Sequence, residues 1–149
     1  MAKPFTFHMQ IREDLDAQNE VESLRSFFER PDVVRALDEK GIVHFARVVL
    51  IPNDRITPKT KGTFAIQVML TYDGNVHDLV DWFLETQPFR TMFRKISSIG
   101  KVPCRRCSDP KALRKYILQN NLNSTRRELH MGYRLSVKAI RGLFSSKSA

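Results

Sequence analysis

The chain has 149 residues, of which 42% are hydrophobic and 28% are charged, and its formal net charge is +9. This length suits one domain with its own hydrophobic core, and we treat residues 1–149 as a single domain. No apolar run reaches the length of about 18 residues that a spanning helix needs, and the first residues lack the apolar segment of a signal peptide. We therefore expect a cytoplasmic protein.

The positive charge is concentrated in the last third of the chain. Lys101–Ala149 contains twelve Lys and Arg against two Asp and Glu, whereas Met1–Thr60 contains nine against ten. Such asymmetry favours a partner with negative charge, either nucleic acid or anionic lipid, although a solvated basic face would give the same pattern. The residues that could contact phosphates include Arg105, Arg106, Lys111, Arg114, Lys115, Arg126, Arg127, Arg134, Lys138 and Arg141.

The first part of the chain predicts one strand followed by helix. Phe5–Ile11 alternates apolar and polar residues, which is typical of a half-buried strand. Apolar residues at helical spacing follow, and we place the start of a helix near Glu20, after polar cap residues. Pro31 should kink or divide this helix because proline lacks a backbone N–H, and Gly41 predicts its end.

The stretch from Ile42 to Phe83 carries the clearest pattern. It predicts two strands, at 44–51 and 63–72, joined by a long loop with two prolines. Asp73-Gly74-Asn75 predicts a turn and the cap of a helix whose buried stripe runs from Val76 to Leu84.

The remaining part of the chain is less regular. We expect one or two helical turns at 89–96, a loop to about residue 108, and a short helix capped by Asp109. A last strand at 129–134 and a terminal helix from Ser136 follow. This order predicts an α+β protein with the ferredoxin-like β-α-β-β-α-β arrangement, an antiparallel sheet with helices on one face, a basic insertion at about 88–127 and a C-terminal helix.

Strand alternation predicts which residues point away from the helices. A guanidinium is rarely tolerated in a core, so Arg47 should lie on the open face, and we expect it to face Gln67. The open face suits a small anionic or amphiphilic ligand, with Arg47 on the negative group and Met69 with Phe45 as apolar wall. A polar subunit interface is the alternative. The predicted ligand-binding residues are His8, Arg47, Gln67, Met69, His130 and Arg134.

Three short segments carry a resemblance to a known group: His44–Arg47 (HFAR), Tyr72–Gly74 (YDG) and Gly132–Val137 (GYRLSV). With the order of elements, they make the chain similar to the dimeric α+β barrel superfamily. More narrowly, the chain resembles uncharacterised bacterial proteins that occur beside or fused to haem peroxidases and catalases. The resemblance implies a homodimer of ferredoxin-like sheets and a link to oxidative metabolism, with haem as a possible cofactor. The basic insertion has no counterpart in it.

Motifs for other chemistry are sparse. Cys104 and Cys107 form a single C-x-x-C without the two further ligands of a zinc site, and we interpret them as plain loop cysteines of a reducing compartment. A redox pair, with thiol pKa lowered by the adjacent Arg105 and Arg106, is the less favoured alternative. His44 should bond the backbone at a strand start, and His77 is an exposed first-turn residue or, less favourably, a haem ligand. No hydrolase, phosphate-loop or dinucleotide motif occurs, so the sequence leaves open whether the protein is an enzyme, a ligand binder or a binder of polyanions.

Overall fold

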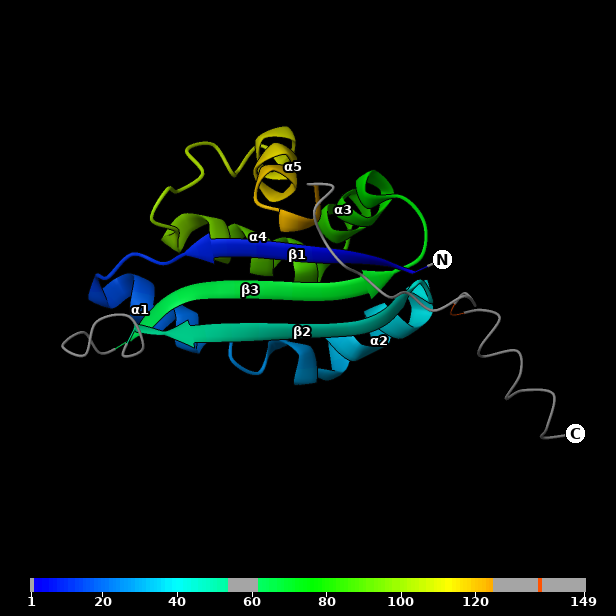
Figure 1. Ribbon diagram of the computed structural model, residues 1–149, viewed down its shortest axis with the longest axis horizontal. Coiled ribbons are helices and arrows are strands. Elements are labelled where there is room, and N and C mark those ends of the chain that lie inside the picture. The colour runs from blue at the N-terminus through cyan, green and yellow to red at the C-terminus, as the bar shows by residue number, and fades with distance from the viewer. Residues whose placement is uncertain (1, 54–61, 125–136, 138–149) are drawn as a thin grey trace, which may run out of the picture.

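The computed structural model describes residues 2–53, 62–124 and 137 of the chain (Figure 1). The strands are β1 (Lys3–Gln10), β2 (Val43–Pro52) and β3 (Thr63–Tyr72), and the helices are α1 (Leu15–Glu22), α2 (Pro31–Lys40), α3 (Val76–Glu85), α4 (Gln87–Ile99) and α5 (Pro110–Gln119). Two short 3₁₀ turns, η1 (Phe27–Glu29) and η3 (Leu122–Ser124), complete the described elements.

The described strands form one antiparallel sheet with β3 in the centre, β1 on one side and β2 on the other (Figure 1). Since β1 and β2 both run antiparallel to β3, they are parallel to each other, with α1 and α2 in the connection between them. This split β-α-β arrangement confirms the α+β class. The predicted strand at 129–134 and the terminal helix from Ser136 lie outside the described residues, so the complete ferredoxin-like order stays a prediction.

One hydrophobic core fills the space between the sheet and the helices. Alternate strand residues point into it and are at most 4% exposed, which confirms the predicted inward face of β1 and of most of β3: Phe5, Phe7, Met9, Ile11, Ile66, Val68, Leu70 and Tyr72. Buried side chains from all five helices belong to the same cluster. Burial of large aromatic and aliphatic side chains stabilises each by roughly 1.5–3 kcal/mol relative to exposure, so this face accounts for much of the stability of the fold.

The segments that flank α5 hydrogen-bond to the outer edge of β1. Lys101 N–H donates to the Gln10 carbonyl at 2.8 Å, and His8 N–H donates to the Asn120 carbonyl at 3.0 Å. Gly100 is buried at this junction, where a Cβ atom would come 2.5 Å from Met9 Sδ and 3.0 Å from Tyr116 Oη. The edge of β1 therefore holds the basic insertion against the sheet.

The helices differ from the sequence predictions mainly in where they begin and end. α1 begins at Leu15 rather than near Glu20, because the Asp14 carboxylate accepts from Ala17 N–H at 2.9 Å and caps the helix there. Leu15 is 73% exposed, so hydrophobic spacing could not reveal this first turn. Pro31 divides the helical region as predicted and opens α2, which ends at Gly41 with φ 64°.

α4 confirms the predicted helical spacing and is longer than expected. Phe89, Met92, Phe93 and Ile96 are buried along one side. The helix continues through Ser97 and Ser98, which the sequence placed in a loop. Their hydroxyls donate to the carbonyls of Arg94 and Lys95 at 2.9 and 2.7 Å, and this local bonding allows serine inside a helix. α5 begins after Asp109, which caps it as predicted by accepting from Lys111 N–H at 3.1 Å.

No helix in the described part of the chain combines the length and apolar character needed to cross a bilayer.

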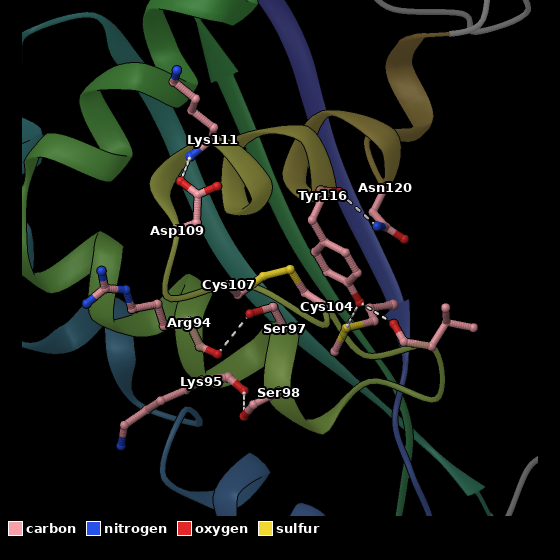
Figure 2. Close-up of a disulfide and its surroundings, with 12 residues drawn as sticks. Arg94, Lys95, Ser97, Ser98, Cys104, Cys107, Asp109, Lys111, Tyr116 and Asn120 are labelled. Carbon is pink, nitrogen blue, oxygen red and sulfur yellow. Dashed lines mark hydrogen bonds between the residues drawn. A yellow bond between two sulfur atoms is a disulfide. The ribbon is translucent and has the colours of Figure 1, made fainter.

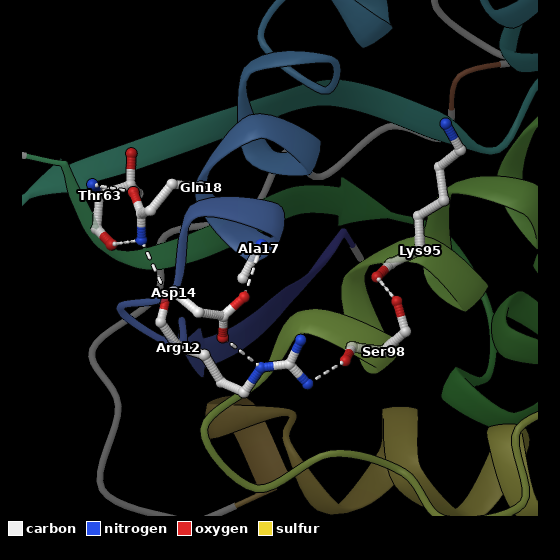
Figure 3. Close-up of polar contacts among 7 residues, drawn as sticks. All are labelled: Arg12, Asp14, Ala17, Gln18, Thr63, Lys95 and Ser98. Carbon is white, nitrogen blue, oxygen red and sulfur yellow. Dashed lines mark hydrogen bonds and ion pairs between the residues drawn. The ribbon is translucent and has the colours of Figure 1, made fainter.

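Gln18 joins three parts of the chain at the end of the sheet (Figure 3). Its side-chain amide donates to the carbonyls of Arg12 and Thr63 at 2.9 and 3.0 Å, and its Oε1 accepts from Thr63 N–H at 2.7 Å. One amide thus fixes α1 to the start of β3 and to the segment that leaves β1.

We expect Gln18→Ala to lower the free energy of unfolding by about 1–3 kcal/mol, because the N–H of buried Thr63 loses its partner. Urea unfolding measures this, with Asn19→Ala, an exposed neighbour on the same helix, as control. Equal midpoints for the two variants would show that the amide contributes nothing.

Candidate functional site

The open face of the sheet carries the predicted site. Phe45 is 50% exposed and Arg47 is also exposed, whereas the alternate residues of β2, Ala46, Val48 and Leu50, pack against the core. The direction predicted from the Arg47 guanidinium is therefore confirmed. In the described part of the chain, helices cover one side of the sheet, and Arg47 and Phe45 are exposed on the other side, where Ala65 is buried.

The residue opposite Arg47 is Met69 and not Gln67. The register of β2 and β3 pairs Arg47 with Met69, and it pairs Gln67 with Val49. The prediction that Arg47 faces Gln67 is wrong: the two residues share the open face, but the register is shifted by two residues along β3, to Met69. Neither the length of the hairpin loop nor the alternation of residue types specifies such a shift.

Gln67 instead contacts His8 of β1, the strand that pairs with the other edge of β3. Its side-chain amide nitrogen lies 3.1 Å from His8 Nδ1, and the two residues are register partners across β1 and β3. Both side chains are partly exposed. The sequence prediction that they share the open face is confirmed, and the hydrogen bond orients the imidazole along the sheet.

Four of the six predicted ligand-binding residues thus form two adjacent pairs. Arg47 with Met69 occupies one row across the sheet, and His8 with Gln67 occupies the next row along β3. The other two predicted residues, His130 and Arg134, lie outside the described residues.

Arg47 is positioned by contacts with a thioether sulfur and an aromatic ring rather than by a carboxylate. Its Nη2 donates to Met69 Sδ at 3.6 Å, and its guanidinium carbon lies 5.9 Å from the centre of the Phe45 ring. No carboxylate forms an ion pair with it among the residues that the structure describes. A planar guanidinium beside apolar surface can pair with a carboxylate, sulfonate or phosphate through two parallel hydrogen bonds.

Asp73 forms a second polar cluster at the end of β3, which sequence reasoning treated only as a turn. Its Oδ1 lies 3.0 Å from His44 Nε2, and its Oδ2 accepts from Val137 N–H at 2.9 Å. His44 thus bonds a carboxylate, a partner that the sequence did not indicate. Partial burial alone would raise the pKa of Asp73, but the hydrogen bonds from His44 and Val137 outweigh it and lower this pKa below its ordinary value. Asp73 thus connects two distant parts of the chain.

His77 lies in the first turn of α3, as predicted, and contacts α5. Its Nδ1 is 3.2 Å from Arg114 Nη2, and Arg114 Nε donates to Asp81 Oδ1 at 2.6 Å. The hydrogen bond from Arg114 lowers the pKa of Asp81. The ion pair fastens α5 to α3.

An axial haem ligand needs a ring nitrogen turned toward an apolar pocket the size of the macrocycle, and neither His44 nor His8 meets this requirement. His44 is buried with Nε2 on Asp73, and His8 lies on the open sheet. The hollow beside His77, about 640 Å³, has Lys3 and three asparagines in its lining. Among the described residues no group of three or more His, Cys, Asp and Glu is placed to hold a metal ion.

The two cysteines differ from the prediction of unpaired loop residues. Cys104 and Cys107 are joined in a disulfide within the turn before α5, with their Cα atoms 5.6 Å apart (Figure 2). The turn brings the two Cα atoms into the range that a disulfide requires, and the sequence spacing alone cannot show that.

Comparison of the chain with protein-family models, with curated proteins and with solved structures gives no match. The resemblance to dimeric α+β barrel proteins therefore stays a prediction.

We expect Asp73→Asn to lower the free energy of unfolding by about 1–3 kcal/mol at pH 7, because a carboxylate that accepts two hydrogen bonds is replaced by an amide. The folded pKa of Asp73 lies below the unfolded value, so its stabilisation is present above pH of about 4 and is lost as pH falls through the folded pKa. The variant should consequently lose less stability than the parent chain below pH 4.

Thermal unfolding between pH 2.5 and 7 measures this difference. Asp78→Asn, on the exposed side of α3, is the control. Parallel pH profiles for the parent chain and Asp73→Asn would contradict a role for this carboxylate.

Proposed function

We propose that the open face of the sheet binds a small anionic or amphiphilic molecule, with Arg47 paired to the negative group. The observation that carries the proposal is the setting of Arg47, an exposed guanidinium without a carboxylate partner among the described residues and with Met69 and Phe45 as neighbours. A positive charge next to apolar surface favours ligands that contain both an anionic head and an apolar body.

The surroundings of Arg47 support an amphiphilic ligand rather than a small inorganic anion. Phe45 and Val49 flank Arg47 on the same face of β2, and Met69 lies opposite. The half-exposed Phe45 ring offers apolar area that a ligand would remove from water, at roughly 25 cal/mol per Å². His8 and Gln67, in the neighbouring row, supply polar atoms that could orient an oxygen-rich part of the ligand.

We further propose that a second copy of the chain covers this face and encloses the ligand. Two observations support it: the exposure of Phe45 beside apolar neighbours, and the resemblance to proteins whose sheets pair face to face. The same resemblance supports a role in oxidative metabolism. An interface without any ligand is the competing hypothesis, and the experiment below separates the two.

Arg47→Ala should weaken binding of laurate by about 10- to 100-fold, because a charge-assisted hydrogen bond to a bound anion is worth roughly 1.5–3 kcal/mol. Laurate binding is measured by displacement of the fluorescent anion anilinonaphthalene sulfonate from the full chain. Dodecanol, which has the same apolar body without the charge, should bind the parent chain and Arg47→Ala equally.

The matched control is Arg35→Ala, which removes an exposed arginine from α2. Equal laurate affinity in both arginine variants, or no laurate binding by the parent chain, would overturn the ligand proposal. Native mass spectrometry of the same samples tests the proposed dimer. We expect the parent chain to be a dimer and Phe45→Asp to be a monomer. If the parent chain is a monomer at every concentration, the dimer proposal is overturned and the ligand proposal is not affected.

A further inference from the structure

We propose that the surface formed by α5 and the Cys104–Cys107 turn binds the backbone of single-stranded nucleic acid, and that the disulfide holds the turn in the binding conformation. This site lies at the β1 edge of the molecule and is separate from the open-face ligand of the preceding section (Figure 1).

The surface contains two adjoining hollows. One, of about 740 Å³, is lined by residues of the 102–106 segment and by α5; the other, of about 420 Å³, is lined by α5 alone. Lys115 and Gln119 border both hollows, so the hollows adjoin at these two side chains, and we refer to the two hollows together as the depression. A depression of this kind can follow a flexible chain, whereas a flat bilayer surface would contact only its rim.

Positive charge dominates the depression and its rim. The cations there are Lys101, Arg105, Arg106, Lys111, Arg114 and Lys115. Among the described residues, Arg114 is the only one of these six that forms an ion pair, at 2.6 Å from Asp81. The nearby Asp109 carboxylate accepts from Lys111 N–H as the helix cap. The remaining cations are available for phosphates.

The spacing of the α5 cations suits a phosphate backbone. Lys111 and Lys115 are four residues apart on one helix, which separates them by about 6 Å along the axis. This is of the order of the distance between successive phosphates in an extended strand. Arg114, which is paired with Asp81, lines the same hollow, so three cations lie within little more than one turn of the helix.

The floor of the depression is partly apolar, and this favours a single strand over a duplex. Val102, Pro103 and Ala112 line the larger hollow and Leu118 lines the smaller one. The bases of a single strand can contact such a floor, whereas a duplex presents mainly phosphate and sugar. Tyr116, which lines the larger hollow, is held by its hydroxyl, which donates to the Val102 carbonyl at 2.8 Å.

The turn that carries Arg105 and Arg106 is held at several points. Cys104 N–H donates to the Ser97 carbonyl at 3.1 Å, and Asp109 N–H donates to the Arg106 carbonyl at 2.8 Å. The disulfide closes the turn around the two exposed arginines, and Cys107 packs against the core. Reduction would break the covalent link between Cys104 and Cys107 and leave Arg105 and Arg106 on a loop that is free to change conformation.

The test is fluorescence anisotropy of the full chain with a labelled 20-nucleotide oligo(dT). Lys111→Ala/Lys115→Ala should weaken binding at least tenfold and reduce the salt dependence by about 1.4 in slope, which corresponds to two phosphate contacts on a single strand. Arg35→Ala/Lys40→Ala, which removes two cations from α2, is the control and should leave affinity within about twofold. Circular dichroism verifies that both variants are folded.

The disulfide is tested with dithiothreitol, whose two thiols transfer two electrons and two protons to Cys104 and Cys107 and become a cyclic disulfide. We expect severalfold weaker oligo(dT) binding after reduction, and equally weak, dithiothreitol-insensitive binding by Cys104→Ser/Cys107→Ser. Unchanged affinity after reduction would overturn the role of the disulfide.

Three outcomes would overturn the nucleic-acid site itself. These are equal affinity of the α5 variant and its control, tighter binding of a 20-base-pair duplex than of oligo(dT), and binding to phosphatidylserine vesicles with no binding to oligo(dT). The first would place the contact on the other basic residues of the chain, and the third would identify an anionic membrane as the partner.

Discussion

The alternation of the central strand β3 decides what each side of the molecule can do. Ile66, Val68, Leu70 and Tyr72 point to the helices and are at most 3% exposed. Their neighbours Gln67 and Met69 must then point the other way, because a strand has period two. Since β3 pairs with both β1 and β2, this one alternation aligns the open-face residues of all three strands, Arg47 and His8 included.

The edge of β1 provides a second organising contact. Backbone bonds from Lys101 and to Asn120 hold both ends of the α5 region on that edge, and the pair formed by Arg114 and Asp81 fastens the helix to α3. The apolar side of α5 contributes Leu113 and Ile117 to the common core, while these backbone bonds and the ion pair hold its polar surroundings. This explains how a segment with six cations and one acid between residues 101 and 124 remains part of the same core.

Residue type was enough to predict the main features of the fold. The exposed direction of Arg47 followed from the cost of burying a guanidinium, and Pro31 and Asp109 marked helix boundaries through local chemistry. These properties depend on one residue and its immediate neighbours. The described strands and helices therefore agree with the sequence in kind and in order.

Partners across the structure could not be predicted in the same way. The register of β2 and β3 placed Met69 rather than Gln67 opposite Arg47, and the carboxylate of Asp73 reached His44, 29 residues away in sequence. The pairing of Cys104 with Cys107 depended on the shape of one turn. Each is a property of the folded backbone, and a single sequence carries no signal for the distances involved.

Gly100 shows how relatives of this chain could be recognised even where overall similarity is weak. Its Cα lies against Met9 and Tyr116, so that any Cβ would come within 3.0 Å of both side chains. A substitution here would require both neighbours to change together. A glycine at the end of the fourth helix, four residues before a C-x-x-C and sixteen before a tyrosine, is consequently a structural fingerprint that can be searched for directly.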